Sequence, residues 1–161
     1  MSKLYVNEIH PKTSGGEVKL PEVPMFSVGG RASATSLDAA LSNFDYITQW
    51  TTTDVDKGGL LNSGGYAEIP TGEGGIYQIS AFYLRGDHTD YNSLILIKYD
   101  GSSYTTIASA YSFNDYNNDT NGATFLMELN EGDRIYCGYD DRYAIPISNN
   151  YASKFSMMKI R

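Results

Sequence analysis

FLMELNEGDRIYCGYD, residues 125–140, holds two apolar runs separated by a polar corner. The first run stops at the corner and the second restarts after it, which predicts two β-strands joined by a turn. Gly132 can adopt turn conformations closed to other residues, and the Asp133 side chain can accept hydrogen bonds from nearby backbone amides. We therefore expect the corner to be architectural, joining two buried strands, and not part of an active site.

The composition is typical of a single β-rich domain with many turns. The chain has 161 residues, of which 19% are charged and 13% aromatic, with 14 tyrosines and 16 glycines. This length suffices for one hydrophobic core, and the amino-acid composition favours strands over helices. The net charge of −7 argues against a nucleic-acid partner, because phosphate binding needs clustered Lys and Arg.

Short strand-like runs recur along the chain, separated by Gly, Pro and Asn. In residues 93–113, Asp100-Gly101 lies between two alternating runs and predicts a hairpin turn. About eight to ten such strands indicate an all-β, antiparallel sandwich or jelly roll. Apolar residues recur at the spacing of a helix only once, in residues 34–44. This segment could form a short helix within a loop or remain irregular.

Two of the predicted strands are apolar on both faces. Residues 76–83 and 94–99 carry apolar side chains at both odd and even positions. A strand of a two-layer sandwich is expected to show one face to water, so the second face needs a cover, which predicts self-association. The candidate interface or core residues of these strands are Ile76, Phe82, Leu94, Ile95, Leu96, Ile97 and Tyr99.

The first 24 residues differ from the rest and predict an extended arm, which leaves residues 25–161 as the domain. Pro and Gly interrupt short alternating apolar stretches, so the arm cannot bury its own apolar side chains. It needs the domain, another copy or a different protein as a neighbour. The apolar positions that would anchor it are Leu4, Val6, Ile9, Val18 and Leu20.

Cysteine usage and hydropathy place the protein in a cytoplasm during synthesis. Cys137 is the only cysteine, so no intrachain disulfide can form, and we expect it to be a small buried side chain. No segment approaches the ~18 apolar residues of a membrane span, and the first residues lack the pattern of a secretion signal. We therefore expect no membrane insertion.

Residues suited to catalysis are scarce, and we expect neither an enzyme nor an obligatory cofactor. The two histidines, His10 and His88, are far apart in the sequence, and nucleophile, phosphate-loop and Cys-His metal motifs are missing. Two oxygen-rich loops leave calcium open as an alternative to ordinary solvated turns. The candidate calcium ligands are Asp87, Asp90, Asp115 and Asp119. Tyrosines beside loops make a host glycan or receptor site plausible.

Several spaced segments resemble C1q and tumour-necrosis-factor-like domains. In residues 64–83 an aromatic strand ends in Pro70, and Gly75-Ile76-Tyr77 opens the next strand. The LNEGDRI corner, the first strand in residues 24–30 and the closing strand in residues 153–160 also resemble that family, although Met157 replaces the usual small residue. The resemblance covers residues 24–161 and implies a ten-stranded jelly roll assembled as a homotrimer.

The arm sequence resembles the openings of structural and tail-fibre proteins of tailed bacteriophages. This resemblance implies a virion component, made in the host cytoplasm, that serves as a knob, fibre tip or capsid decoration. The arm would then bind other virion proteins, and the domain would project outward toward the host surface. The alternative is a free carbohydrate-binding lectin with a C1q-like fold.

Overall fold

The computed structural model describes residues 23–30, 33–36, 44–84, 92–112, 120–140 and 154–160. These segments form eleven β-strands. They are β1 (Met25–Gly29), β2 (Ser33–Ser36), β3 (Phe44–Gln49), β4 (Thr52–Lys57), β5 (Ala67–Glu68), β6 (Gly75–Leu84), β7 (Asn92–Tyr99), β8 (Tyr104–Ser112), β9 (Thr120–Leu129), β10 (Arg134–Asp140) and β11 (Lys154–Lys159). No helix in the described segments is long and apolar enough to cross a membrane.

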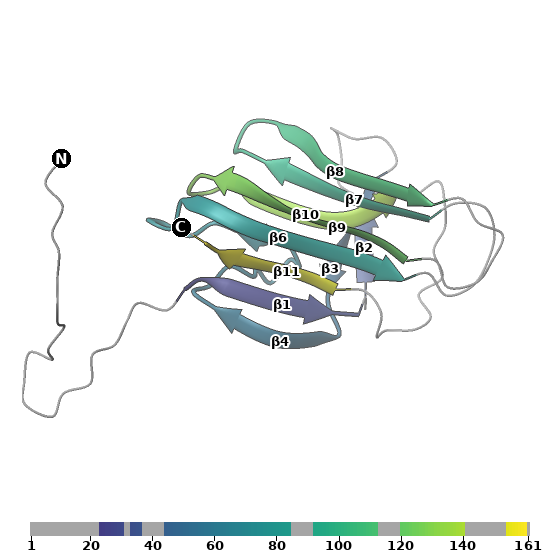
Figure 1. The fold of residues 1–161 in the computed structure, drawn as a ribbon, viewed down its shortest axis with the longest axis horizontal. Helices are drawn as coiled ribbons and strands as arrows, with labels where there is room; N and C mark the ends of the chain where they lie inside the picture. Colours follow the sequence, from purple (N-terminus) through teal and green to yellow (C-terminus); the bar gives the residue numbers. More distant parts are fainter. Residues whose placement is uncertain are drawn as a thin grey trace, which may run out of the picture.

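The strands form two antiparallel sheets. The first sheet has the order β4-β1-β11-β6-β9, and the second has the order β2-β3-β10-β7-β8, with β5 added beside β10. Strands β1 and β11, from opposite ends of the domain, lie side by side in the first sheet (Figure 1). This sandwich confirms the predicted all-β jelly-roll architecture.

The main core fills the space between the sheets. Phe26 of β1 and Phe155 of β11 meet edge to face, with ring centroids 4.9 Å apart. On β6, Tyr77, Ile79 and Ala81 are buried, as the alternation of this strand predicts. Each large apolar side chain buried in this way contributes about 1.5–3 kcal/mol relative to exposure.

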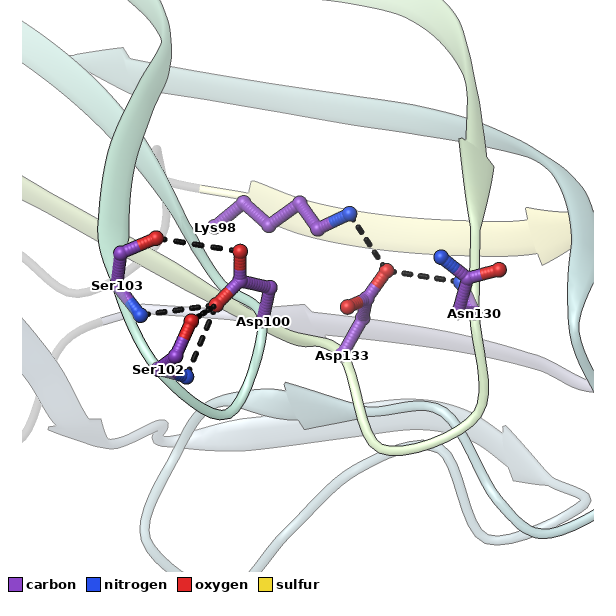
Figure 2. Close-up of polar contacts among 6 residues, drawn as sticks. All are labelled: Lys98, Asp100, Ser102, Ser103, Asn130 and Asp133. Atoms are coloured by element: carbon purple, nitrogen blue, oxygen red, sulfur yellow. Dashed lines mark hydrogen bonds and ion pairs between the residues drawn. The ribbon is translucent and has the colours of Figure 1, made fainter.

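The polar corner between β9 and β10 is anchored by one buried residue, Asp133, while Asn130, Glu131 and Gly132 are exposed. The Asp133 side chain accepts a hydrogen bond from the Asn130 backbone amide at 2.8 Å and pairs with the Lys98 ammonium at 2.7 Å (Figure 2). The Asp133 carbonyl accepts from the Ile69 amide, and the Gly132 amide donates to the Ile69 carbonyl, both at 2.9 Å. Gly132 has φ of 82°, which favours glycine. The architectural role predicted for this corner is confirmed.

The β7–β8 hairpin turns at Asp100, as predicted. The Asp100 side chain accepts hydrogen bonds from the Ser103 amide and from the hydroxyl and amide of Ser102 (Figure 2). These bonds, that of the Ser103 amide first, hold the pKa of the Asp100 carboxyl far below its ordinary value. Gly101, with φ of 92°, completes the turn.

The helical spacing in residues 34–44 does not produce a helix at either end of that segment. Ala34 to Ser36 belong to β2, which pairs with β3, and Phe44 opens β3 as a buried residue. Pairing with a neighbouring strand satisfies the backbone and buries Phe44, which overrides a weak local preference. Residues 37–43 lie outside the described segments. So do residues 1–22, with the five apolar positions predicted to anchor the arm.

Burial raises the pKa of three groups on strands β6 and β10. The Tyr77 phenol, the Tyr136 phenol and the Cys137 thiol each reach a pKa of about 12, and in each case desolvation is the largest cause. The Tyr77 hydroxyl also donates to the Glu73 carbonyl at 2.6 Å. All three groups are therefore protonated at neutral pH, and the buried thiol matches the expectation from the sequence.

We expect Asp133→Asn to lower the free energy of unfolding by about 2–3 kcal/mol, because it leaves the Lys98 ammonium without its buried carboxylate partner. Chemical denaturation measures the change. Asp56→Asn, at an exposed carboxylate on β4, is the matched control and should be neutral. Equal stabilities of the two variants would contradict the role assigned to Asp133.

We expect stability to fall as the pH rises from about 9 to 12. The three raised pKa values mean that the folded chain keeps protons which the unfolded chain releases above its ordinary values of 9.0 for Cys and 10.0 for Tyr. Their contribution is complete below pH about 8.5. Denaturation midpoints at pH 8, 10 and 11 test this, and Tyr136→Phe should flatten the decline; a constant midpoint would contradict it.

Candidate functional site

The outer face of the first sheet exposes large apolar side chains. In the single chain the exposed fraction is 63% for Leu126, 50% for Ile160, 41% for Phe82 and 37% for Met158. Strand register places Met25, Met158, Gln78 and Leu126 in one row across β1, β11, β6 and β9. We call this surface, with Ile76 beside it, the β6 outer face. An exposed patch of this kind marks an interaction site.

A second row on the β6 outer face carries hydroxyl groups. It consists of Ser27, Ser156, Ser80 and Thr124, and the last two hydroxyls are 2.5 Å apart. Toward β4, the Lys154 ammonium pairs with the Asp54 carboxylate, and the hydrogen bond from Lys154 lowers the pKa of that carboxyl. The centre of the face therefore carries small, neutral polar groups between apolar ones.

The two sides of the sandwich differ in how their edge strands are protected. On β4, Asp54, Asp56 and Lys57 supply charges, and the register with β1 shifts at a bulge. Charges and bulges discourage pairing with another chain. On the other side β8 and β9 lie near each other; β8 contains no charged residue and β9 contains one, Glu128, although the register of β7 with β8 also shifts at a bulge. The β8–β9 side is therefore the less protected of the two.

The outer face of the second sheet is covered by the chain's own aromatic rings. Ile95 and Ile97 of β7 are buried in a cluster with Phe44 and Tyr136. The partly buried tyrosines packed against this cluster are Tyr46, Tyr66, Tyr99 and Tyr104. The expectation that a partner chain must cover the second face of β7 is therefore wrong, because residues distant in sequence provide the cover. We use the name tyrosine face for the surface formed by Arg134 and five tyrosines: Tyr46, Tyr66, Tyr99, Tyr104 and Tyr136.

Arg134 joins the tyrosine face to a carboxylate. Register places Glu68, Arg134, Tyr99 and Tyr104 in one row across β5, β10, β7 and β8. The Arg134 guanidinium lies 5.4 Å from the ring centroid of Tyr66 and 5.9 Å from that of Tyr99, and one of its nitrogens is 3.3 Å from a Glu68 oxygen. Cation–π contacts and the ion pair hold the guanidinium in place.

A pocket of about 330 Å³ lies between the β9–β10 corner and β5. Its lining includes Leu61, Asn62, Glu68, Thr71 and Glu131. The side-chain amide of Asn62 donates to the second Glu68 carboxylate oxygen at 3.3 Å. The backbone amide of Gly72 donates to a Glu131 carboxylate oxygen at 3.0 Å. The Gly72 hydrogen bond is the largest cause that lowers the pKa of the Glu131 carboxyl. The pocket lining thus combines apolar side chains, such as Leu61, with hydrogen-bonding groups.

The structure separates the interface or core residues predicted for β6 and β7 into three environments. Leu94 and Leu96 lie in the main core, Ile95 and Ile97 lie beneath the tyrosine face, and Tyr99 packs there as well. Phe82 is exposed on the β6 outer face, and Ile76 lies there partly buried.

Other predicted site residues lie outside the described segments, and one part of the site was missed. The four aspartates proposed for calcium are among those outside, and the described residues contain no group of three or more potential metal ligands.

The tyrosine face was missed by the sequence analysis because its members are separated in sequence. Alternation in residues 134–139, which places Arg134 and Tyr136 on one face, is the signal that could have indicated it.

Comparison with known proteins identifies the fold. No protein-family model and no curated protein matches the sequence. The crystal structure of murine APRIL at pH 8.0 is similar, with a TM-score of 0.66 and 14% identity over 86% of this chain and 100% of that one. Murine APRIL at pH 5.0 gives a TM-score of 0.63 and 13% identity over the same shares. The chain thus has the jelly-roll fold of tumour-necrosis-factor-like proteins, as its sequence predicts.

Proposed function

We propose that this chain is a non-enzymatic, homotrimeric jelly-roll protein whose subunits associate through the β6 outer face. The observation that carries the proposal is the contrast between the two sheets. The second sheet covers its outer face with its own tyrosines, whereas the first sheet leaves Leu126 and Phe82 exposed. An apolar face without cover in one chain is suited to another copy of that chain.

The difference between the two sides of the sandwich favours a ring. The less protected β8–β9 side is an edge of the sandwich, whereas the β6 outer face is the face of a sheet, so packing the edge of one subunit against the face of another makes a heterologous contact. Such contacts repeat around an axis and close into a ring when the rotation allows it. Closure with three subunits is the arrangement that the resemblance to C1q and tumour-necrosis-factor-like domains implies.

The energetics require a larger contact than the four exposed side chains alone. Each is about half exposed, so complete burial contributes roughly 1 kcal/mol per side chain. Association costs roughly 4–15 kcal/mol in lost freedom of motion. An interface above ~2,000 Å² in total, which also covers the β8–β9 side, would meet this requirement and would make the free monomer scarce.

The chemistry of the described residues supports a binding role and not catalysis. Cys137 is the only thiol, and its burial and raised pKa leave it neutral and inaccessible as a nucleophile. Glu68 and Glu131 are engaged in hydrogen bonds or an ion pair. These groups stabilise local structure.

We propose further that the trimer belongs to a bacteriophage particle and is made in the host cytoplasm. The support is the resemblance of the arm to the openings of phage structural and tail-fibre proteins. A core that needs no disulfide also suits folding in a reducing compartment. In this role residues 1–24 bind other virion proteins, and the jelly roll serves as a knob, fibre tip or capsid decoration facing the host surface.

We expect Leu126→Asp to convert the trimer into a folded monomer, because it places a charge at the centre of a buried apolar contact. Sedimentation velocity measures the assembly, and circular dichroism checks the fold. Leu126→Met, which conserves volume, is the matched control and should remain trimeric. A trimer of undiminished stability in Leu126→Asp would rule out this interface.

We expect antibodies against the jelly roll to label intact phage particles, and deletion of residues 1–24 to abolish incorporation while leaving the trimer intact. Immunogold electron microscopy and mass spectrometry of purified particles are the measurements. Particles that incorporate the shortened chain at the normal level would show that the arm is not the anchor. Absence of the protein from particles would contradict the virion role and leave the assembly unaffected.

A further inference from the structure

We propose that the tyrosine face, with the adjoining pocket, binds a neutral oligosaccharide. The proposal extends beyond the assembly and does not depend on it, because it concerns the outer face of the second sheet, which the proposed assembly borders only at its edge strand β8. It rests on the row formed by Glu68, Arg134, Tyr99 and Tyr104. This row crosses four strands and presents ring surface and hydrogen-bonding groups side by side.

The rings at one end of the row are suited to stacking against a sugar. Tyr99 and Tyr104 lie with centroids 4.5 Å apart and ring planes inclined by 31°, and both are partly exposed. Tyrosine combines rigid apolar area with a polar hydroxyl, which matches a pyranose that has C–H faces and a rim of hydroxyls. Tyr66 and Arg134 continue this surface toward β5.

Charge and polarity select the class of ligand. Arg134 is paired with Glu68, so the row has no net charge from these two groups, and Glu131 adds a carboxylate in the pocket. An anionic ligand would meet that carboxylate without a free cation in the row. Another protein chain would desolvate the tyrosine hydroxyls and the ion pair, and the described residues place the largely exposed aliphatic side chains outside the second sheet. A neutral polyhydroxylated ligand avoids repulsion from the Glu131 carboxylate. Its hydroxyl groups can also replace the water that hydrates the tyrosine hydroxyls and the ion pair.

Glu68 connects the rings to the pocket. One of its oxygens contacts Arg134 in the row, and the other accepts from Asn62 in the pocket lining. The pocket volume of about 330 Å³ lies within the range of small-ligand sites. One terminal sugar can enter the pocket, between Asn62 and Thr71, while the following sugars stack on the row.

The test is a titration of the full chain with neutral malto-, cello-, chito-, manno- and galacto-oligosaccharides by saturation-transfer NMR. Sialylated and sulfated oligosaccharides form the anionic arm. We expect saturable binding of at least one neutral series and no binding in the anionic arm. Backbone amide shifts of the wild-type chain should map the ligand to Tyr99, Tyr104 and Arg134. Shifts confined to other residues, or no binding of any neutral series at about 10 mM, would overturn the proposal.

A matched pair of variants tests the stacking itself. Tyr104→Ala removes a ring at the edge of the row and should weaken binding about tenfold, whereas Tyr104→Phe keeps the ring and should weaken it less than about threefold. Unchanged affinity in Tyr104→Ala would also overturn the proposal. Both variants should sediment as the wild-type trimer, because the Tyr104 ring packs on the outer face of the second sheet. This control separates lost stacking from damage to the assembly, which β8 borders.

Discussion

The structure depends on one constraint: its central strands are apolar on both faces, and each face needs a cover. The inner faces of β6 and β7 meet in the main core, where Tyr77 and Leu96 are fully buried. The outer faces are covered in different ways. On the second sheet the chain supplies its own tyrosines, whereas on the first sheet Phe82 and Leu126 are exposed in the single chain. This asymmetry is the basis on which we propose the first sheet for assembly and the second for ligand binding.

The two surfaces are also different in chemistry, which supports different tasks. The β6 outer face combines aliphatic side chains with small hydroxyls, a composition that dry subunit interfaces tolerate. The tyrosine face combines rings with a neutralised ion pair, which would lose more hydration if another protein covered it. In the proposed ring, the subunit contact would bury the outer face of the first sheet and would leave most of the tyrosine face accessible. A protein that presents an outward binding face in several copies gains avidity without new contacts.

Features that depend on neighbouring residues could be predicted from the sequence, and features that depend on distant ones could not. The Asp100 hairpin, the Asp133 corner and the two faces of β6 follow from turn chemistry and alternation within short segments. The cover of Ile97 could not be predicted, because Tyr66 and Tyr136 come together only through sheet register. At Ala34 to Ser36, the start of the segment with helical spacing, pairing with β3 outweighs the local preference. Exposure of Leu126 likewise depends on where β9 lies in the sheet.

Native mass spectrometry of the full chain at micromolar concentration tests the central claim most directly. We expect one dominant species of three chains, with little monomer even on dilution, because the proposed contact buries the β6 outer face between subunits. A stable, fully folded monomer under those conditions would contradict it. That result would show that Phe82 and Leu126 tolerate water without a partner.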